Sequence, residues 1–189
     1  MMGNRENLIS EKVHKFTWVT EFPLVEYDEE EGRYVSLHHP FTSPREEDRG
    51  HMMDQPEKTK ARAYDLVMNG KEIGGGSIRI HEEQLQRDMF QLLGMDLEVA
   101  EEKFGFLMDA FKYGAPPHGG IALGLDRIIM LLTGANSLRD VIAFPKNQRA
   151  QSLMDDAPSQ VDPKQLEDLH IKLTSSARKA LEEAKDQSR

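Results

Sequence analysis

The sequence has no cysteine, no long apolar run and fewer basic than acidic residues. Without cysteine there can be no disulfide and no thiolate metal site, which is consistent with a reducing cytoplasm. No apolar run approaches the roughly 20 residues that a membrane-spanning helix needs. Met1–Glu11 is polar and lacks the apolar stretch of a signal peptide. We therefore expect a soluble, cytoplasmic chain with no membrane partner.

The charge balance is acidic, with 33 Asp and Glu against 24 Lys and Arg and a formal net charge of −9. Such a balance argues against a domain that grips nucleic acid, DNA included, along a broad basic face. An acidic site can instead hold a divalent cation and, through it, a phosphate. The alternative is that the acidic excess only keeps the protein soluble.

Alternating apolar and polar residues predict β-structure in the first half of the chain. Lys15–Asp28 is rich in aromatic and branched residues and is predicted as a strand, with Arg33–His39 returning as its hairpin partner. Asn69-Gly70 separates the apolar runs Ala63–Met68 and Lys71–Ile80. This dipeptide predicts a second, tight hairpin, because a type I′ turn requires positive φ at both central residues.

Helices are predicted after the hairpins. Two amphipathic stretches end at Gly94 and Gly114, and a third, apolar helix begins near Gly124. The charged segment Ser43–Arg62 is predicted to be an exposed loop, and Val141–Phe144 to be a short apolar strand.

These elements together indicate an α+β fold, with an antiparallel β-sheet flanked by helices. Within the chain, residues 1–161 are predicted to form the main domain and residues 162–189 a C-terminal extension. The extension is predicted to contain a helix that starts at Asp162-Pro163 and a charged, peripheral helix over Ser175–Arg189.

Three clusters contain residues suited to chemistry. In the first, His38-His39 precedes a bend at Pro40. Adjacent strand residues face opposite sides, but the histidine nearest the strand end can turn inward through the bend. A histidine pair there suits recognition of a carboxylate; the alternative is two partly exposed polar residues.

The second cluster joins Asp65 to the segment Glu72–Arg79. Two carboxylates on one hairpin can share a Mg²⁺ ion bound to phosphate oxygens. Three consecutive glycines, Gly74–Gly76, allow a ligand to approach the backbone closely. Arg79 can form a paired hydrogen bond with a carboxylate, which lysine cannot reproduce. The alternative is a glycine-rich edge strand with surface charges.

The third cluster, His118–Arg127, runs into the apolar helix Ile128–Leu132. An arginine in the first turn of a helix opposes the helix dipole, so it costs stability unless an anion lies near. Phosphate is an obvious candidate. The glycine pattern is neither a Walker loop nor a dinucleotide fingerprint.

The third cluster resembles motif 3 of class II aminoacyl-tRNA synthetases. Gly120, Ala122 and Gly124 occupy the small positions, with alanine in place of the middle glycine. Five sequence segments, taken in order, are very similar to segments of bacterial-type aspartyl-tRNA synthetases: HHPFTSP, AYDLVMNG, EIGGGSIRIH, FGFLMDAFKYGAPPHGG and DVIAFPK. The similarity runs from about Phe16 to about Pro158. It implies that residues 1–161 are the C-terminal part of a class II catalytic domain.

The resemblance implies an ATP site. Arg127 would bind the γ-phosphate of ATP, while Glu72 would face ATP and its Mg²⁺ and Asp65 would assist with the metal. The nucleotide segment would be completed by Gly124, Leu125 and Asp126.

The resemblance also implies an aspartate site. Arg79 would hold the side-chain carboxylate of L-aspartate, His38 matches the family's aspartate-contacting histidine, His39 would help, and Ser77 lies close by. In the family's reaction the aspartate α-carboxylate attacks the α-phosphorus of ATP. Aspartyl-adenylate and pyrophosphate form, and the aspartyl group then passes to the 3′ end of tRNA. The enzyme accelerates this reaction by positioning the two substrates and by neutralising their negative charge.

The family also has an anticodon-binding barrel, a motif 1 that builds a homodimer interface and a motif 2 arginine on the α-phosphate. The sequence shows none of these, so we expect a fragment of a longer homodimeric enzyme, inactive alone. Two alternatives are an ATP-dependent amide ligase of the same fold and a non-catalytic ligand-binding module. The phrase HHPFTSP speaks against the first, and intact Glu72, Arg79 and Arg127 speak against the second.

Strand parity yields a geometric prediction. In a regular strand Glu72 and Arg79 would point to opposite faces, whereas the resemblance requires both to face one cavity with Asp65. A β-bulge between them would restore the match by inserting one extra residue. Gly74–Gly76 is the predicted place for it, because glycine tolerates positive φ.

Overall fold

The structure is a computed structural model that describes residues 13–152, 154–155 and 157–180. Contacts divide the chain into two units, Met1–Leu138 and Arg139–Arg189. The predicted division after residue 161 remains a prediction. Among the described residues, no helix combines the length and apolar character needed to cross a membrane.

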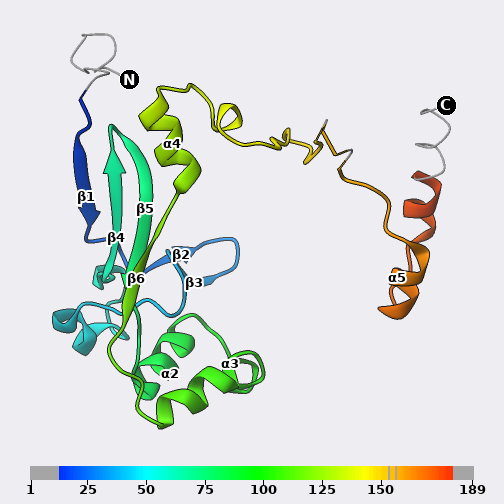
Figure 1. Ribbon diagram of the computed structural model, residues 1–189. Coiled ribbons are helices and arrows are strands. Elements are labelled where there is room, and N and C mark those ends of the chain that lie inside the picture. The colour runs from blue at the N-terminus through cyan, green and yellow to red at the C-terminus, as the bar shows by residue number, and fades with distance from the viewer. Residues whose placement is uncertain (1–12, 153, 156, 181–189) are drawn as a thin grey trace. The chain divides into compact units, whose positions relative to one another are not determined.

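The first unit contains a four-stranded antiparallel sheet in the order β1-β4-β5-β6 and a separate two-stranded sheet, β2-β3. The predicted α+β architecture, an antiparallel sheet with flanking helices, is confirmed (Figure 1). The strands are β1 (Phe16–Thr20), β2 (Val25–Asp28), β3 (Arg33–Ser36), β4 (Ala63–Met68), β5 (Lys71–Ile78) and β6 (Gly119–Leu123). The helices of this unit are η1 (Glu46–His51), η2 (Pro56–Lys58), α2 (Glu83–Leu92), α3 (Leu97–Lys112) and α4 (Leu125–Thr133), and η3 (Leu138–Asp140) begins at the last residue of the unit.

The predicted tight hairpin joins β4 and β5. Met68 pairs with Lys71 across the turn. Asn69 and Gly70 have φ angles of 49° and 80°, so both central residues have the positive φ that a type I′ turn requires. The turn therefore fixes the register in which β5 begins to pair with β4.

The prediction of one strand over Lys15–Asp28 is wrong. The stretch forms β1 in the large sheet and β2 in the small one, and the break falls at Glu21, whose φ is 66°. A positive φ at a non-glycine residue interrupts extended backbone, and Pro23 then makes only an isolated bridge, to Lys60. The predicted pairing with the following strand holds for the second half alone, where Val25 pairs with Ser36.

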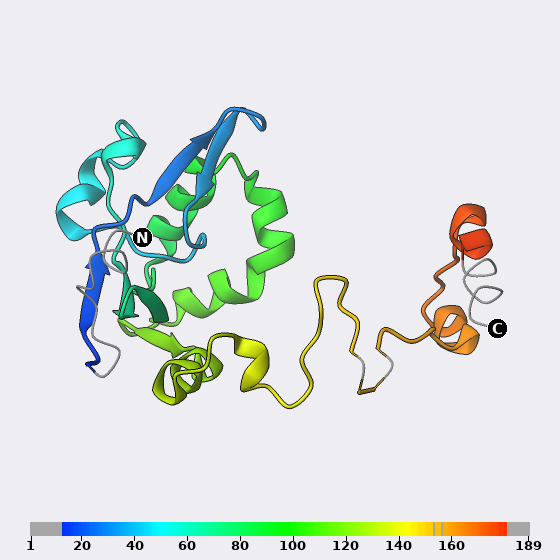
Figure 2. The same cartoon turned by 90° about the horizontal axis from the view of Figure 1, so that it is seen from above.

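The helices α2 and α3 bury the faces that their apolar spacing predicts. One core cluster contains Leu85, Met89 and Leu93 together with Leu24 and Val25, the first residue of β2. In Figure 2 the β2-β3 hairpin accordingly lies next to α2. A neighbouring face of α2 packs through its buried residue Phe90 into a second cluster with α3, which contributes Ala100, Met108 and Phe111. Gly94, Gly114 and Gly134 end α2, α3 and α4 with positive φ, as predicted for the first two.

The segment Ser43–Arg62 is not simply an exposed loop. It contains η1 and η2, and Met52 and Thr59 are fully buried within it. The carbonyl of Thr59 accepts a hydrogen bond from the Leu24 backbone N–H at 2.9 Å. The segment is anchored because its backbone runs beside the chain that links β1 to β2, a contact that its charged composition conceals.

The second unit contains α5 (Pro163–Asp168), which starts at the predicted position. The Asp162 carboxylate caps it by accepting a hydrogen bond from the Lys164 N–H at 2.8 Å. Ser175–Ala180 is helical, and the rest of the predicted helix lies outside the described residues. The predicted strand Val141–Phe144 is wrong: these residues form a turn and bends. Apolar character alone does not make a strand where no partner strand pairs with it.

Candidate active site

Strand β5 changes parity between Glu72 and Arg79, as predicted. Val67 on β4 pairs with Glu72, but the residue before Val67 pairs with Gly74, so Ile73 is the extra residue of a β-bulge. The bulge turns the Ile73 side chain into the interior, where it is 5% exposed. Beyond it, Arg79 faces the same side of the sheet as Glu72.

The predicted location of the bulge at Gly74–Gly76 is wrong. All three glycines pair regularly with β4 on one side and β6 on the other, and none of them has positive φ. Two of them are needed for close approach instead. An added Cβ would lie 2.6 Å from Leu123 Cδ2 at Gly74 and 1.9 Å from the Gly120 carbonyl oxygen at Gly76. These two glycines therefore admit β6 to the sheet.

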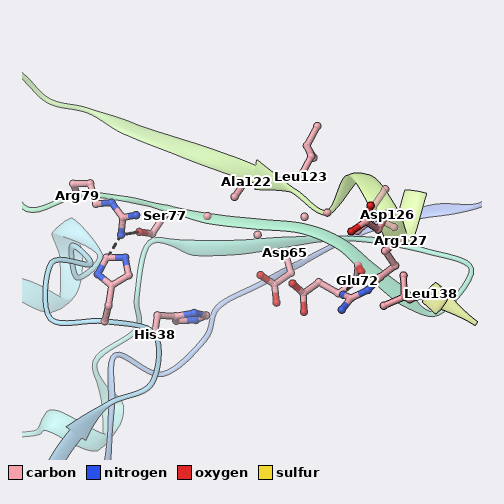
Figure 3. Close-up of a pocket in the computed structure, with 16 residues that line it drawn as sticks. His38, Asp65, Glu72, Ser77, Arg79, Ala122, Leu123, Asp126, Arg127 and Leu138 are labelled. Carbon is pink, nitrogen blue, oxygen red and sulfur yellow. Dashed lines mark hydrogen bonds between the residues drawn. The ribbon is translucent and has the colours of Figure 1, made fainter. Parts of the chain in front are cut away.

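Gly75 makes room for two carboxylates on the opposite face. An added Cβ there would lie 2.5 Å from Asp65 Oδ1 and 3.6 Å from Glu72 Oε1, so both carboxylates lie close to this glycine. Figure 3 shows the Asp65 and Glu72 side chains next to each other on one side of the sheet. Two such oxygen donors suit Mg²⁺, which commonly takes one or two protein carboxylates and completes its shell with phosphate oxygens and water. Within the described ranges, no three His, Cys, Asp or Glu residues gather as a metal-binding group.

One end of the site is built around Arg79. Its Nη1 donates to Ser77 Oγ at 2.8 Å and contacts His39 Nδ1 at 3.2 Å. Arg79 is partly buried, and its contacts with Ser77 and His39 hold the guanidinium in a fixed direction. Such an arginine suits two-pronged binding of a carboxylate.

His39 is neutral in this arrangement. Its Nδ1 also accepts a hydrogen bond from the Phe41 N–H at 3.1 Å. Since the Phe41 amide and the Arg79 guanidinium can only donate, Nδ1 is the acceptor and the ring proton lies on Nε2. Burial, followed by the positive charge of Arg79 and then by His38, lowers the pKa of His39 below its ordinary value. The ring therefore stays uncharged at neutral pH.

Backbone pairing brings the histidine segment to the end of β5. Ser43 N donates to the Ile78 carbonyl and Ile80 N to the Phe41 carbonyl, each at 2.9 Å. His38 precedes this pairing, and its ring meets Phe22 edge-on with centroids 4.8 Å apart. The bend at Pro40 thus places both predicted histidines at the cavity.

The other end of the site is built around Arg127. The Gly124 N–H donates to the Ile73 carbonyl at 2.8 Å, which fastens the start of α4 to the bulge. Arg127 Nη1 donates to the Glu72 backbone carbonyl, so the arginine turns back toward β5 rather than outward. Asp126 shares the first turn of α4, where a negative charge is favourable. Arg127, whose positive charge the dipole of α4 disfavours, is thereby held close to the carboxylates of Asp65 and Glu72.

A single cavity of about 610 Å³ joins these parts. It brings together eight of the nine predicted site residues: His38, His39, Asp65, Glu72, Arg79, Gly124, Asp126 and Arg127. The ninth, Leu125, does not line it and is 65% exposed. Ser77, expected close by, lines it too, as do Ile73, Gly74, Gly75, Gly76, Ala122, Leu123 and Leu138.

Most of these additional lining residues belong to motifs already visible in the sequence. Ala122 and Leu123 fall in the alternating strand before Gly124, and register alone shows that they border the site. Leu138 lies beyond the end of α4, and no local pattern singles it out.

The chain is similar in sequence and in fold to known tRNA synthetases. The sequence profile of the tRNA synthetases of class II (D, K and N) matches residues 4–148. The chain is 62% identical over 172 residues to the aspartate--tRNA(Asp/Asn) ligase of Caldanaerobacter subterraneus subsp. tengcongensis, and 60% identical over 172 residues to the aspartate--tRNA ligase of Macrococcus caseolyticus. Each alignment covers 91% of this chain but only 29% of the relative.

Among solved structures, the fold is similar to the aspartyl tRNA synthetase from Entamoeba histolytica, with a TM-score of 0.53 and 25% sequence identity. That match covers 71% of this chain and 23% of the other. The fold of this chain is therefore similar to that of part of a synthetase with only 25% identical sequence.

Proposed function

Because the chain belongs to the class II tRNA synthetases of the D, K and N group, we propose that its cavity is the aspartate and ATP side of an aspartate–tRNA ligase. The observation that carries the proposal is the placement of two arginines at opposite ends of one cavity, with an acidic pair between them (Figure 3). A molecule with a carboxylate at one end and phosphates at the other matches this order of charges.

The Arg79 end binds the side-chain carboxylate of L-aspartate. Ser77 and neutral His39 occupy one edge of the guanidinium and leave its other N–H groups for a ligand. His38, at the same end of the cavity, borders the amino acid. Because the cation is partly buried, it favours a carboxylate over the uncharged amide of asparagine.

The Arg127 end binds the phosphates of ATP. Asp65 and Glu72 would hold Mg²⁺, which neutralises phosphate charge when bound. Arg127, which donates to the Glu72 backbone carbonyl, would bind the γ-phosphate, and Gly124 and Asp126 would complete this end of the cavity.

In the proposed reaction an oxygen of the aspartate α-carboxylate attacks the α-phosphorus of ATP, and the bond to the bridging oxygen breaks. The products are aspartyl-adenylate and pyrophosphate, and the aspartyl group is later transferred to the 3′ end of tRNA. No side chain serves as a nucleophile. Arg79 and Arg127 instead fix the two substrates in line, and their charges are in place before the reaction begins.

The chain spans 29% of the length of the relatives named above, and we propose that it works as part of a longer homodimeric, cytoplasmic enzyme. Binding of tRNA would then depend mainly on parts outside these 189 residues, in keeping with the net charge of −9. The segment HHPFTSP speaks against an amide ligase of the same fold, and intact Glu72, Arg79 and Arg127 speak against a non-catalytic module.

A chimera tests the proposal. This chain replaces the matching segment of the Caldanaerobacter enzyme, to which it is 62% identical. We expect the chimera to catalyse aspartate-dependent ATP–pyrophosphate exchange, and Arg127→Ala in the chimera to reduce the exchange by about a hundredfold, as is common for the loss of one preorganised charge. The 189-residue chain alone should not exceed a blank without enzyme. A folded chimera without exchange would refute the proposed function.

A further inference from the structure

Gln86 is a buried amide beneath the histidine segment. It lies on α2, is 0% exposed, and donates from Nε2 to the Pro40 carbonyl oxygen at 2.8 Å. Its Oε1 is also buried and has no hydrogen-bond partner among the described residues. A buried acceptor without a donor costs stability. The cost of the unpaired Oε1 opposes the gain from the hydrogen bond to Pro40. A contribution to overall stability therefore does not explain why a glutamine stands at this position.

The Pro40 carbonyl and the Phe41 N–H belong to the same peptide group, which is planar. Gln86 holds the oxygen of this plane, and the N–H at its other end donates to His39 Nδ1 at 3.1 Å. The same nitrogen contacts Arg79 Nη1 at 3.2 Å. Fixing the rotation of one peptide plane thus fixes the hydrogen bond that orients the imidazole, and the imidazole in turn orients the arginine.

We propose that Gln86 is a positioning residue for Arg79, acting through the Pro40–Phe41 peptide and the His39 ring. The proposal deepens the proposed function, because it assumes that Arg79 is the group that holds the carboxylate of the amino acid. Gln86 itself does not line the cavity.

A separate apolar anchor keeps the segment in place when Gln86 is changed. The Phe41 ring meets Phe90 and Phe104 edge-on, with centroids 6.3 Å and 5.2 Å apart. Aromatic pairs of this kind stabilise packing without fixing the rotation of a neighbouring peptide. Removing the amide should therefore free the peptide plane while the segment stays docked on α2 and α3.

The test is Gln86→Met in the full 189-residue chain, with Gln91→Met, an exposed position on the same helix, as the matched control. Methionine keeps the length of the side chain and removes both the donor and the unpaired acceptor. Imidazole ¹⁵N NMR over a pH titration reads the tautomer and the pKa of His39. In the wild type and the control, Nδ1 should be unprotonated and the pKa lowered. In Gln86→Met the two neutral tautomers of the His39 ring should mix, because the Phe41 N–H is no longer held against Nδ1.

Thermal unfolding of the same proteins separates positioning from a structural role. Unchanged His39 resonances in Gln86→Met would overturn the proposal. If the variant also loses much of its thermal stability, the role of Gln86 is structural instead. If Gln86→Met does not fold, Gln86→Leu replaces it, read in the same way.

Kinetics of the chimera give a second readout. Gln86→Met should raise the KM for aspartate by about tenfold, the effect of losing one ordinary hydrogen bond, and leave the KM for ATP unchanged. Equal changes in both KM values would contradict positioning through Arg79. A chimera with no exchange in its unmutated form would refute the proposed function but not the NMR result, so the two failures are distinguishable.

Discussion

Replacing Gly75 and Gly76 by alanine, one at a time, should separate function from stability at adjacent positions. The two changes add the same methyl group to the same strand, on opposite faces of the sheet. At Gly75 the new Cβ would lie 2.5 Å from Asp65 Oδ1, which is the end of a rotatable side chain. At Gly76 it would lie 1.9 Å from the Gly120 carbonyl oxygen and 2.9 Å from Ile121 Cα, which are backbone atoms of β6.

The expected magnitudes follow from what has to move. At Gly75, displacing the Asp65 carboxylate from its rotamer costs about 0.5–1.5 kcal/mol. Restricting the unfolded chain returns about 0.4–1 kcal/mol, so the free energy of unfolding should change by less than about 1 kcal/mol. At Gly76 the backbone of β6 must shift, and overpacking of this kind costs about 1–3 kcal/mol or more. Chemical denaturation of the 189-residue variants measures both changes.

Function should change at Gly75 for a different reason. The added methyl group pushes Asp65 away from Glu72 and separates the two carboxylates proposed to hold Mg²⁺. The Gly75→Ala chimera should therefore need a higher magnesium concentration for half-maximal exchange, with a normal KM for aspartate. If Gly75→Ala destabilises as much as Gly76→Ala, the close-approach explanation is wrong. If its magnesium dependence is that of the wild type, the acidic pair does not hold the metal.

Two further predictions concern the Arg79 end of the cavity. Arg79→Lys in the chimera should weaken transition-state binding by about 1.5–3 kcal/mol, the value of hydrogen bonds to a charged group. Steady-state kinetics should show a much larger rise in the KM for aspartate than in the KM for ATP. An equal rise in both KM values would mean that Arg79 does not bind aspartate. The lowered pKa of His39 also makes stability depend on pH, because the unfolded chain takes up a proton that the folded chain refuses. This contribution to the free energy of unfolding is fully present above the ordinary pKa of 6.5 and is lost as the pH falls through the lower, folded value. Denaturation curves between about pH 7.5 and about pH 5 should show a smaller loss on acidification in His39→Gln, and identical pH dependence in the two proteins would count against a buried, neutral His39.

Local patterns in the sequence predict the elements that depend on a few neighbouring residues. Asn69-Gly70 specifies a turn because the two residues tolerate positive φ, and the turn sets the pairing of Val67 with Glu72. The apolar spacing of α2 and α3 predicts which faces are buried, because a helix repeats in register with itself. The charged residues of the cavity are also recognisable from the sequence, because each of them lies in a short, continuous motif.

The sequence alone also shows that Glu72 and Arg79 require one break in strand parity if they share a cavity. It does not locate that break. The bulge falls at Ile73 because an apolar side chain is buried there, and the glycines serve the approach of β6 instead. The division of Lys15–Asp28 between two sheets is hidden in the same way, since strand alternation does not reveal which sheet a strand will join.

Tertiary structure alone decided how the parts of the site are held. Gln86 and Pro40 are far apart in the sequence, and so are Arg127 and the Glu72 carbonyl, yet each pair forms one hydrogen bond. The sequence determined which chemical groups this protein has and which local elements carry them, because these depend on near neighbours. Their mutual orientation depends on packing between distant segments, whose energies appear only once the chain has folded.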